Sequence, residues 1–108
     1  MTEIVYSPLA LEDLSYIRDY ITDSFGKDLA NRILKKILSD IRRLEDYPLS
    51  GIDLGSIIDV RTEYRYLLSE KNYVFYHLEL DEIRIIRILN EKQDYMQHLF
   101  GVDLEPEL

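Results

Sequence analysis

The chain has 108 residues, 46% of them hydrophobic, and carries 21 acidic against 13 basic residues, a net charge of −8. This length and composition predict a single globular domain over residues 1–108, and the acidic balance argues against broad binding to phosphate backbones. The absence of cysteine excludes disulfides and zinc–thiolate sites, no apolar run reaches the roughly 20 residues of a membrane helix, and the N-terminus lacks a secretion signal, so we expect a cytoplasmic protein.

The first half of the chain predicts a short strand followed by two helices. Residues 2–6 are a short β-rich run, and the dipeptide after them marks a helix start, with Ser7 as N-cap and Pro8 in the first helical position. Apolar residues then recur at helical spacing in two stretches, and the glycine between them predicts an antiparallel helical hairpin. These stretches are residues 8–23 and 29–44, joined around Gly26.

After a loop at residues 47–56, the apolar period changes from about 3.6 to about 2. Three runs rich in β-branched and aromatic residues then predict antiparallel strands joined by tight hairpins, and residues 92–100 predict a last short helix. The three runs are 57–68, 73–80 and 83–89. Helices that precede the strands favour an α+β fold: the N-terminal strand and helical hairpin pack on one face of an antiparallel sheet, and a short C-terminal helix follows.

The second hairpin decides which side chains of the sheet face the helices. A two-residue turn at 81–82 pairs Leu78 with Ile85 and puts Glu79 opposite Arg84. One face is then apolar and forms the core, whereas the opposite face is mixed. The expected core face carries Val74, Tyr76, Leu78, Leu80, Ile83, Ile85 and Leu89, and the opposite face carries Phe75, His77, Glu79, Arg84, Ile86 and Ile88.

The first hairpin, with "SEKN" at its turn, leaves two registers open, because a slip of one residue reverses every side chain. A three-residue loop is our preference, since it keeps the core apolar; a two-residue loop swaps the two sets. The preferred version puts Tyr64, Tyr66 and Leu68 on the core face and Arg61, Glu63 and Arg65 beside His77 on the other. We expect the closing helix to cover that far face through Met96, Leu99 and Phe100.

Five stretches occur in a fixed order: "SPLALEDLSYIRDYI", "YPLSG", "DVRTEYRYLL", "YVFYHLELDEIRIIRIL" and "KQDYMQHLF". In these stretches the sequence resembles the RelE/ParE superfamily of bacterial toxins from type II toxin–antitoxin systems, over residues 4–100. The resemblance implies two helices followed by an antiparallel sheet. It also implies a cognate antitoxin whose extended or helical tail wraps and silences the toxin.

The resemblance leaves the target of the toxin open. RelE-like members cut messenger RNA in the ribosome, whereas ParE-like members inhibit DNA gyrase and are not nucleases. RelE-like toxins typically carry an Arg in a "YRLVY"-type stretch on the central strand, where this chain has "NYVFY" with Tyr73 in place of that Arg. The resemblance therefore favours a ParE-like gyrase inhibitor, of the kind that stabilises plasmids, with a RelE-like endoribonuclease and an inactive structural or regulatory member as alternatives.

A ribonuclease needs groups that activate the ribose 2′-hydroxyl, steady the phosphate and protonate the leaving oxygen. If the chain is one, the catalytic candidates are Arg65, Arg61, Lys92, His77 and Tyr95. Candidates for binding the target or the antitoxin are Arg61, Arg65, Arg84, Lys92, Tyr95 and His98. Simpler interpretations are surface ion pairs for the arginines and a plain surface histidine for His77.

The expected partners are a cognate antitoxin and either DNA gyrase or the ribosome with its messenger RNA, and we expect no metal or cofactor. The sheet edge and the groove between helices and sheet are predicted to take the antitoxin, by strand addition or helix-in-groove contact. A homodimer or a toxin–antitoxin hetero-oligomer fits this picture. Five basic residues of the second helix predict a solvated face or a landing site for an acidic antitoxin: Arg32, Lys35, Lys36, Arg42 and Arg43.

Overall fold

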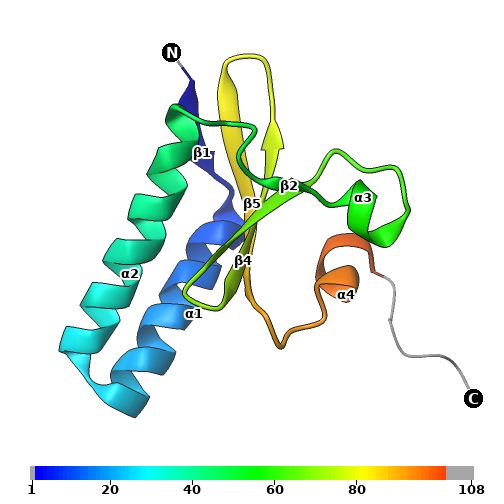
Figure 1. Cartoon of the computed structure of the whole chain (residues 1–108). Helices are drawn as coiled ribbons and strands as arrows, with labels where there is room; N and C mark the ends of the chain where they lie inside the picture. The colour runs from blue at the N-terminus through cyan, green and yellow to red at the C-terminus, as the bar shows by residue number, and fades with distance from the viewer. Residues whose placement is uncertain (1, 102–108) are drawn as a thin grey trace, which may run out of the picture.

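The computed structural model describes residues 2–101, in which two long helices pack against one face of a five-stranded sheet (Figure 1). In chain order the elements are β1 (Glu3–Tyr6), α1 (Pro8–Phe25), α2 (Lys27–Arg42), the 3-10 turn η1 (Arg43–Glu45), β2 (Ile52–Asp53), α3 (Gly55–Ile58), β3 (Arg65–Ser69), β4 (Asn72–Leu78), β5 (Glu82–Asn90) and α4 (Tyr95–Phe100). This confirms the predicted α+β fold with its helical hairpin and short C-terminal helix. No helix in the described part of the chain is long and apolar enough to cross a membrane.

The helical hairpin follows from local sequence signals. The hydroxyl oxygen of Ser7 accepts a hydrogen bond from the backbone N–H of Ala10 at 3.0 Å, and Pro8 opens α1, as predicted. Gly26, at φ 99°, is the single residue between α1 and α2, in a backbone region that glycine enters readily. The apolar stripe of α2 then lies under the sheet, where Ile37 and Ile41 are fully buried.

The sheet is mixed rather than wholly antiparallel. Its strand order is β1-β5-β4-β3-β2, and β1 pairs with β5 in parallel, whereas the other neighbours are antiparallel. The connection between these parallel strands is long, as their geometry requires, and it includes the helical hairpin and strands β2 to β4. The first strand of the chain therefore lies beside the last.

The register of the first hairpin differs from our preferred version. Ser69 pairs with Asn72, so the turn has two residues, Glu70 and Lys71, at φ 51° and 66°. Two successive positive φ angles are typical of a type I′ turn, whose twist matches that of the strands. The two-residue alternative is therefore correct, and the preferred three-residue loop is wrong. Arg65 pairs with Tyr76 and shares its face.

The predicted pairing of the second hairpin is also wrong. Leu78 pairs with Ile83, two residues earlier along β5 than expected, and His77 rather than Glu79 stands opposite Arg84. Leu80 lies in the connection and is 98% exposed rather than buried in the core. The turn is therefore wider than sequence alone indicated.

A β-bulge in β5 reverses the facing of the residues beyond it. Tyr76 pairs with Ile85 but Phe75 pairs with Arg87, so Ile86 is an extra residue without a partner on β4. Ile88 therefore packs with the helix-side core, and Leu89 packs on the far face, the reverse of the prediction. The helix-side core consists of Ala10, Ile37, Ile41, Leu44, Val74, Tyr76, Ile83, Ile85 and Ile88.

Asp40 joins α2 to β3 by polar contacts. The Ser69 hydroxyl donates to one carboxylate oxygen at 2.7 Å, and the Lys36 ammonium donates to the other at 2.7 Å. Burial opposes ionisation of this carboxyl group, but the hydrogen bonds from Lys36 and Ser69 and the nearby charges of Lys36 and Arg43 outweigh it and lower the pKa of Asp40.

We predict that Asp40→Asn lowers the free energy of unfolding by about 1 kcal/mol at pH 7. Because the folded pKa is depressed, the carboxylate's contribution is complete above its unfolded pKa of about 3.9 and is lost as the pH falls through the lower folded value. Urea denaturation of both proteins between pH 7 and pH 2 measures this. A difference that did not shrink with acid would contradict the assignment; Asp19→Asn, in an exposed pair with Arg18, is the matched control.

Candidate functional site

The face of the sheet turned away from α1 and α2 is filled by aromatic side chains. Phe75 is fully buried at its centre. Its ring stacks on Tyr73 at a centroid distance of 5.7 Å and meets the edge of Tyr64 at 6.3 Å. The aromatic cluster, as we call it, consists of Tyr64, Tyr66, Tyr73, Phe75, Tyr95 and Phe100.

Helix α4 covers this far face, as predicted from its apolar residues. Leu99 and Phe100 pack onto the cluster, which confirms the expected cap for these two residues, whereas Met96 is not among the residues packed there. Tyr95, named above as a catalytic and binding candidate, also joins the cluster: its ring lies 5.5 Å from that of Tyr73 and 5.4 Å from that of Phe75. Burial raises the pKa of Tyr95, and likewise of Tyr64, so both phenols stay protonated near neutral pH.

Arg65 lies on the helix side of the sheet, where its guanidinium group binds the loop that follows η1. Its Nη2 donates to the carbonyl oxygen of Gly51 at 2.8 Å and to that of Leu49 at 3.2 Å. The hydroxyl of Tyr76 donates to the carbonyl of Pro48 at 3.0 Å and accepts from the N–H of Gly51 at 3.0 Å. Arg65 and Tyr76 thus form a loop clamp, and this explains the role of the "YPLSG" stretch.

His77 stands on the opposite face from Arg65. It follows Tyr76 along β4, so its side chain points away from the helices, and its ring lies 4.4 Å from that of Tyr64. The expectation that Arg61, Arg65 and His77 share one free surface is therefore wrong, because the type I′ turn places Arg65 on the other face.

The remaining predicted residues come from four different segments of the chain. Arg61 is exposed in the loop after α3, and His98 is exposed on α4. Lys92 is exposed between β5 and α4. Arg84 lies 2.7 Å from a carboxylate oxygen of Glu82 and 3.5 Å from one of Glu79, the simple ion pair considered above.

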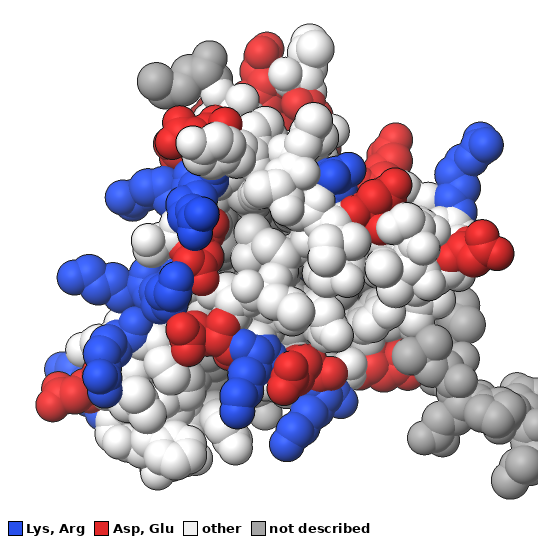
Figure 2. All heavy atoms as spheres, viewed as in Figure 1, with Lys and Arg blue, Asp and Glu red and all other residues white. Residues whose placement is uncertain are grey.

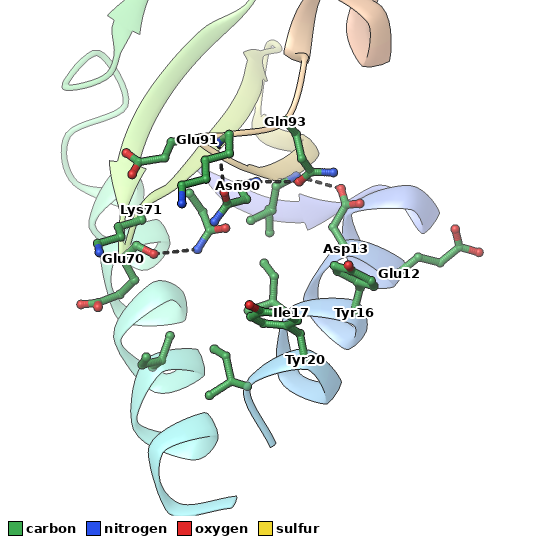
Figure 3. A pocket seen from close by; sticks show the side chains of 15 residues that line it. Glu12, Asp13, Tyr16, Ile17, Tyr20, Glu70, Lys71, Asn90, Glu91 and Gln93 are labelled. Atoms are coloured by element: carbon green, nitrogen blue, oxygen red, sulfur yellow. Dashed lines mark hydrogen bonds between the residues drawn. The ribbon is translucent and has the colours of Figure 1, made fainter. Parts of the chain in front are cut away.

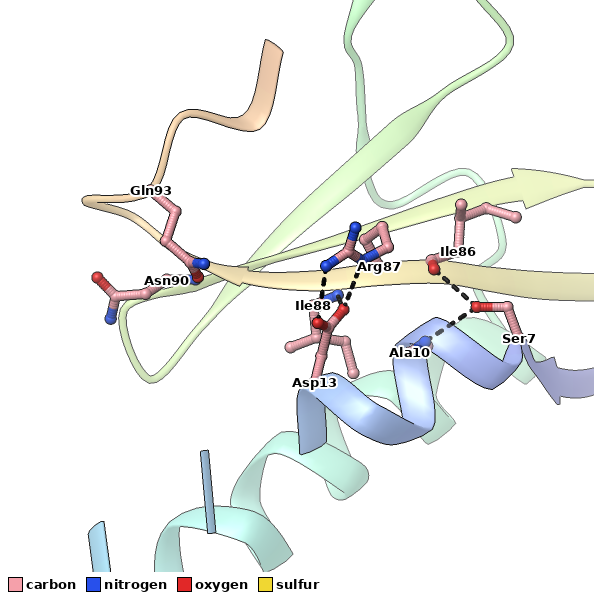
Figure 4. Close-up of polar contacts among 8 residues, drawn as sticks. All are labelled: Ser7, Ala10, Asp13, Ile86, Arg87, Ile88, Asn90 and Gln93. Atoms are coloured by element: carbon pink, nitrogen blue, oxygen red, sulfur yellow. Dashed lines mark hydrogen bonds and ion pairs between the residues drawn. The ribbon is translucent and has the colours of Figure 1, made fainter. Parts of the chain in front are cut away.

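Sequence reasoning missed the pair formed by Asp13 and Arg87, which closes the outer edge of β5 (Figure 4). The Asp13 carboxylate accepts two hydrogen bonds from the Arg87 guanidinium, at 2.8 and 2.9 Å, and one from the N–H of Ile88 at 2.9 Å. The hydroxyl of Ser7 donates to the carbonyl of Ile86 at 2.7 Å. An arginine inside the apolar run "EIRIIRIL" was the available signal, because a cation in a buried strand needs a partner.

A groove of 630 Å³ opens between α1, the β3–β4 turn and the segment after β5 (Figure 3). Its floor is apolar and includes Ile17, Ile21 and Ile88, while Tyr16 and Tyr20 stand exposed along α1. Charged side chains of both signs rim it: Glu12, Asp13, Glu70, Lys71, Glu91 and Lys92. An apolar floor with a polar rim is suited to an amphipathic helix.

Three solved toxin–antitoxin structures contain chains of similar fold. A chromosomal ParDE system from P. aeruginosa matches with a TM-score of 0.72 and 22% identity over 83% of this chain and 96% of that one. A YoeB–YefM complex from Staphylococcus aureus gives 0.53 and 22% over 82% and 95%, and an E. coli DinJ–YafQ complex gives 0.52 and 17% over 94% and 100%. The fold is thus shared with a chain in each of these three structures.

The family follows from the sequence itself. A family model, described as the ParE toxin of the type II toxin–antitoxin system parDE, matches residues 4–95. The chain therefore belongs to the ParE toxin family. A search of curated protein sequences gave no match.

Proposed function

We propose that the protein is a bacterial cytoplasmic toxin that arrests growth by inhibiting DNA gyrase, without cutting nucleic acid, until a cognate antitoxin neutralises it. Membership of the ParE family supports the toxin role. The observation that carries the non-nucleolytic mechanism is the aromatic cluster, which fills the far face of the sheet where an array of cations and proton-transfer groups was expected.

Phosphodiester cleavage needs several polar groups within hydrogen-bond reach of one phosphate. Arg65 donates to loop carbonyls on the helix side, Arg87 is held by Asp13, and His77 lies against Tyr64. Because of these contacts, the three side chains cannot reach one phosphate together in this arrangement. This favours a toxin that inhibits its target by binding rather than by cleaving nucleic acid.

The groove beside α1 is our candidate site for a helix of the antitoxin. Tyr16 and Tyr20 are large, exposed and four residues apart, so they lie on one side of α1 and rim the apolar floor. Tyrosine is enriched at protein interfaces because it combines a broad apolar ring with a polar tip. The toxin–antitoxin complexes of similar fold support a protein partner for this chain.

The target is tested with toxin freed from its antitoxin. We expect it to inhibit supercoiling of relaxed plasmid by purified gyrase, and we expect no new transcript ends when the toxin is expressed in cells. New ends at ribosome-occupied codons that disappear in Arg65→Ala but persist in Arg61→Ala would instead establish the ribonuclease. Because Arg65 also supports a loop, the folding of that variant is checked by thermal unfolding.

A further inference from the structure

Positive charge is concentrated on α2 and the residue that follows it. Residues 27–43 include six lysines and arginines against two aspartates, a net charge of +4 in a chain of net −8. Blue side chains gather over α2, at the left of Figure 2. An acidic protein with such a local surface attracts polyanions there and repels them elsewhere.

The cations of α2 form one row along the helix. At 3.6 residues per turn, five of them fall within an arc of about 120°, and the row extends about 16 Å from Arg32 to Arg43 at 1.5 Å per residue. All five side chains belong to exposed residues. This basic face consists of Arg32, Lys35, Lys36, Arg42 and Arg43.

Most of the basic face is not used in ion pairs within the described part of the chain. Lys36 donates to Asp40 at 2.7 Å, but the ion pairs among residues 2–101 include none of the other four cations. By contrast, Arg18, Arg84 and Arg87 each contact a carboxylate. The four cations are therefore available to a ligand.

Helix stability alone does not account for the row. The helix macrodipole favours cations near the C-terminal end, which explains Arg42 and Arg43. Arg32 and Lys35 are only the sixth and ninth of the 16 residues of α2, so they lie outside its last turn. Asp28, the one acidic residue in the same arc, lies in the first turn, where the macrodipole favours an acid. The first half of the row thus has no explanation within the helix.

The chemistry of the basic face is suited to phosphates. Its arc contains no apolar residue of α2, whereas protein interfaces usually centre on large apolar or aromatic side chains. Ser39 is exposed in the middle of the arc and adds a hydroxyl donor, a common contact to phosphate oxygens. Three of the four available cations are arginines, whose planar guanidinium group binds phosphate in a bidentate geometry.

We propose that the basic face of α2 binds the phosphate backbone of duplex DNA. The major groove is about 12 Å wide, so a row of about 16 Å is long enough to reach phosphates on both of its sides. Contacts to phosphates carry no base information, and the binding is therefore independent of sequence. The inference rests on the proposed function in one respect: the DNA is the segment on which gyrase acts, so the contact adds to the toxin's affinity for gyrase bound to DNA.

Binding of DNA by the toxin alone, without gyrase, is the first test. Fluorescence anisotropy of a labelled duplex of about 20 base pairs follows binding between about 50 and 200 mM salt. Four phosphate contacts predict a slope of about −3.6 when the logarithm of the affinity is plotted against that of the salt concentration. Arg32→Gln combined with Lys35→Gln should reduce this slope to about −1.8 and weaken binding at low salt by about tenfold or more.

The matched control is Arg18→Gln combined with Lys27→Gln. It changes the net charge equally, and both residues are exposed in helices but lie outside the basic face. The control should keep the slope and stay within about threefold of the wild-type affinity, and thermal unfolding checks that both double variants are folded. Equal losses in the two double variants, or no binding of DNA by the wild type at low salt, would overturn the proposal.

A supercoiling assay separates failure of this inference from failure of the proposed function. The Arg32→Gln, Lys35→Gln variant should need about tenfold more toxin than the wild type for half-inhibition of gyrase. Equal potency of the two would overturn the inference and leave gyrase inhibition intact. A wild-type toxin that binds DNA through the basic face but never inhibits gyrase would retain the DNA site and reject the proposed function. A variant that keeps DNA binding but loses the antitoxin would assign the face to an acidic protein and overturn the inference.

Discussion

Replacing Asp13 with alanine is expected to lower the free energy of unfolding by about 3 to 5 kcal/mol, the range found when one partner of a buried ion pair is removed. The side chains of Asp13 and Arg87 are only 13% and 15% exposed, so water replaces the lost carboxylate poorly. The change also strips the Ile88 N–H of its acceptor. Small domains have a total free energy of unfolding of about 5 to 15 kcal/mol, so this single contact accounts for a large share of the stability.

Urea denaturation at pH 7 measures this effect, with Asp13→Asn as the graded variant. Asparagine keeps one carbonyl oxygen for Ile88 or Arg87 but loses the charge, so we expect a loss smaller than that of alanine. The matched control is Asp19→Ala on the same helix, whose pair with Arg18 is exposed and should change stability by about 0.5 kcal/mol or less. A loss below about 1 kcal/mol for Asp13→Ala would mean that the pair contributes little in solution.

The pair also matters for the sheet, because it covers backbone groups of β5 beyond the end of β1. The Asp13 carboxylate accepts a hydrogen bond from the Ile88 N–H, and the Ser7 hydroxyl donates one to the Ile86 carbonyl. Side chains of α1 and its N-cap therefore bind backbone groups of β5 that a neighbouring strand would otherwise bind. On β3, by contrast, β2 pairs with Arg65 and Tyr66, and no strand in the described part of the chain pairs with the outer side of residues 67–69. In the described residues, side chains thus cover the part of β5 beyond β1, whereas the part of β3 beyond Tyr66 has no paired strand on its outer side.

Local signals were sufficient to predict the elements of the first half of the chain. The cap at Ser7 and Pro8 and the apolar stripe of α2 depend on spacing within a few residues, and both are present as predicted. The segment after them was predicted less well. Residues 55–58, "GSII", were assigned partly to a loop and partly to a strand, but they form the short helix α3.

The residues on each face of the sheet could not be predicted from sequence, because two local features determine which side chains point to which face. Glu70 and Lys71 adopt positive φ without being glycine or asparagine, so the type I′ turn has no mark in the sequence. The bulge at Ile86 lies within a largely apolar run, and nothing in the sequence marks its position either. Each feature shifts the register by one residue, and a one-residue shift moves Arg65 or Leu89 to the other face.

Gly51→Ala is expected to destabilise the protein by about 1 to 3 kcal/mol, as overpacking of a filled core does. A methyl group at this position would clash with the Tyr76 hydroxyl and lie 2.7 and 2.8 Å from Cε1 and Cζ of its ring. Tyr76 cannot yield readily, because it is fully buried and its hydroxyl makes hydrogen bonds to Pro48 and Gly51. Ser50→Ala, exposed in the same loop, is the control and should change stability by about 0.5 kcal/mol or less.

A double-mutant cycle with Tyr76→Phe separates the clash from the lost hydrogen bonds. Phenylalanine alone leaves the Pro48 carbonyl and the Gly51 N–H without their partner, at a cost of about 1 to 3 kcal/mol. With the hydroxyl gone, the new methyl group meets one atom fewer, so the double variant should be more stable than the sum of the two single losses by about 0.5 kcal/mol or more. Strict additivity would show that residues 48–51 move away from β4 in the variant, and that the loop clamp is looser than its hydrogen bonds indicate.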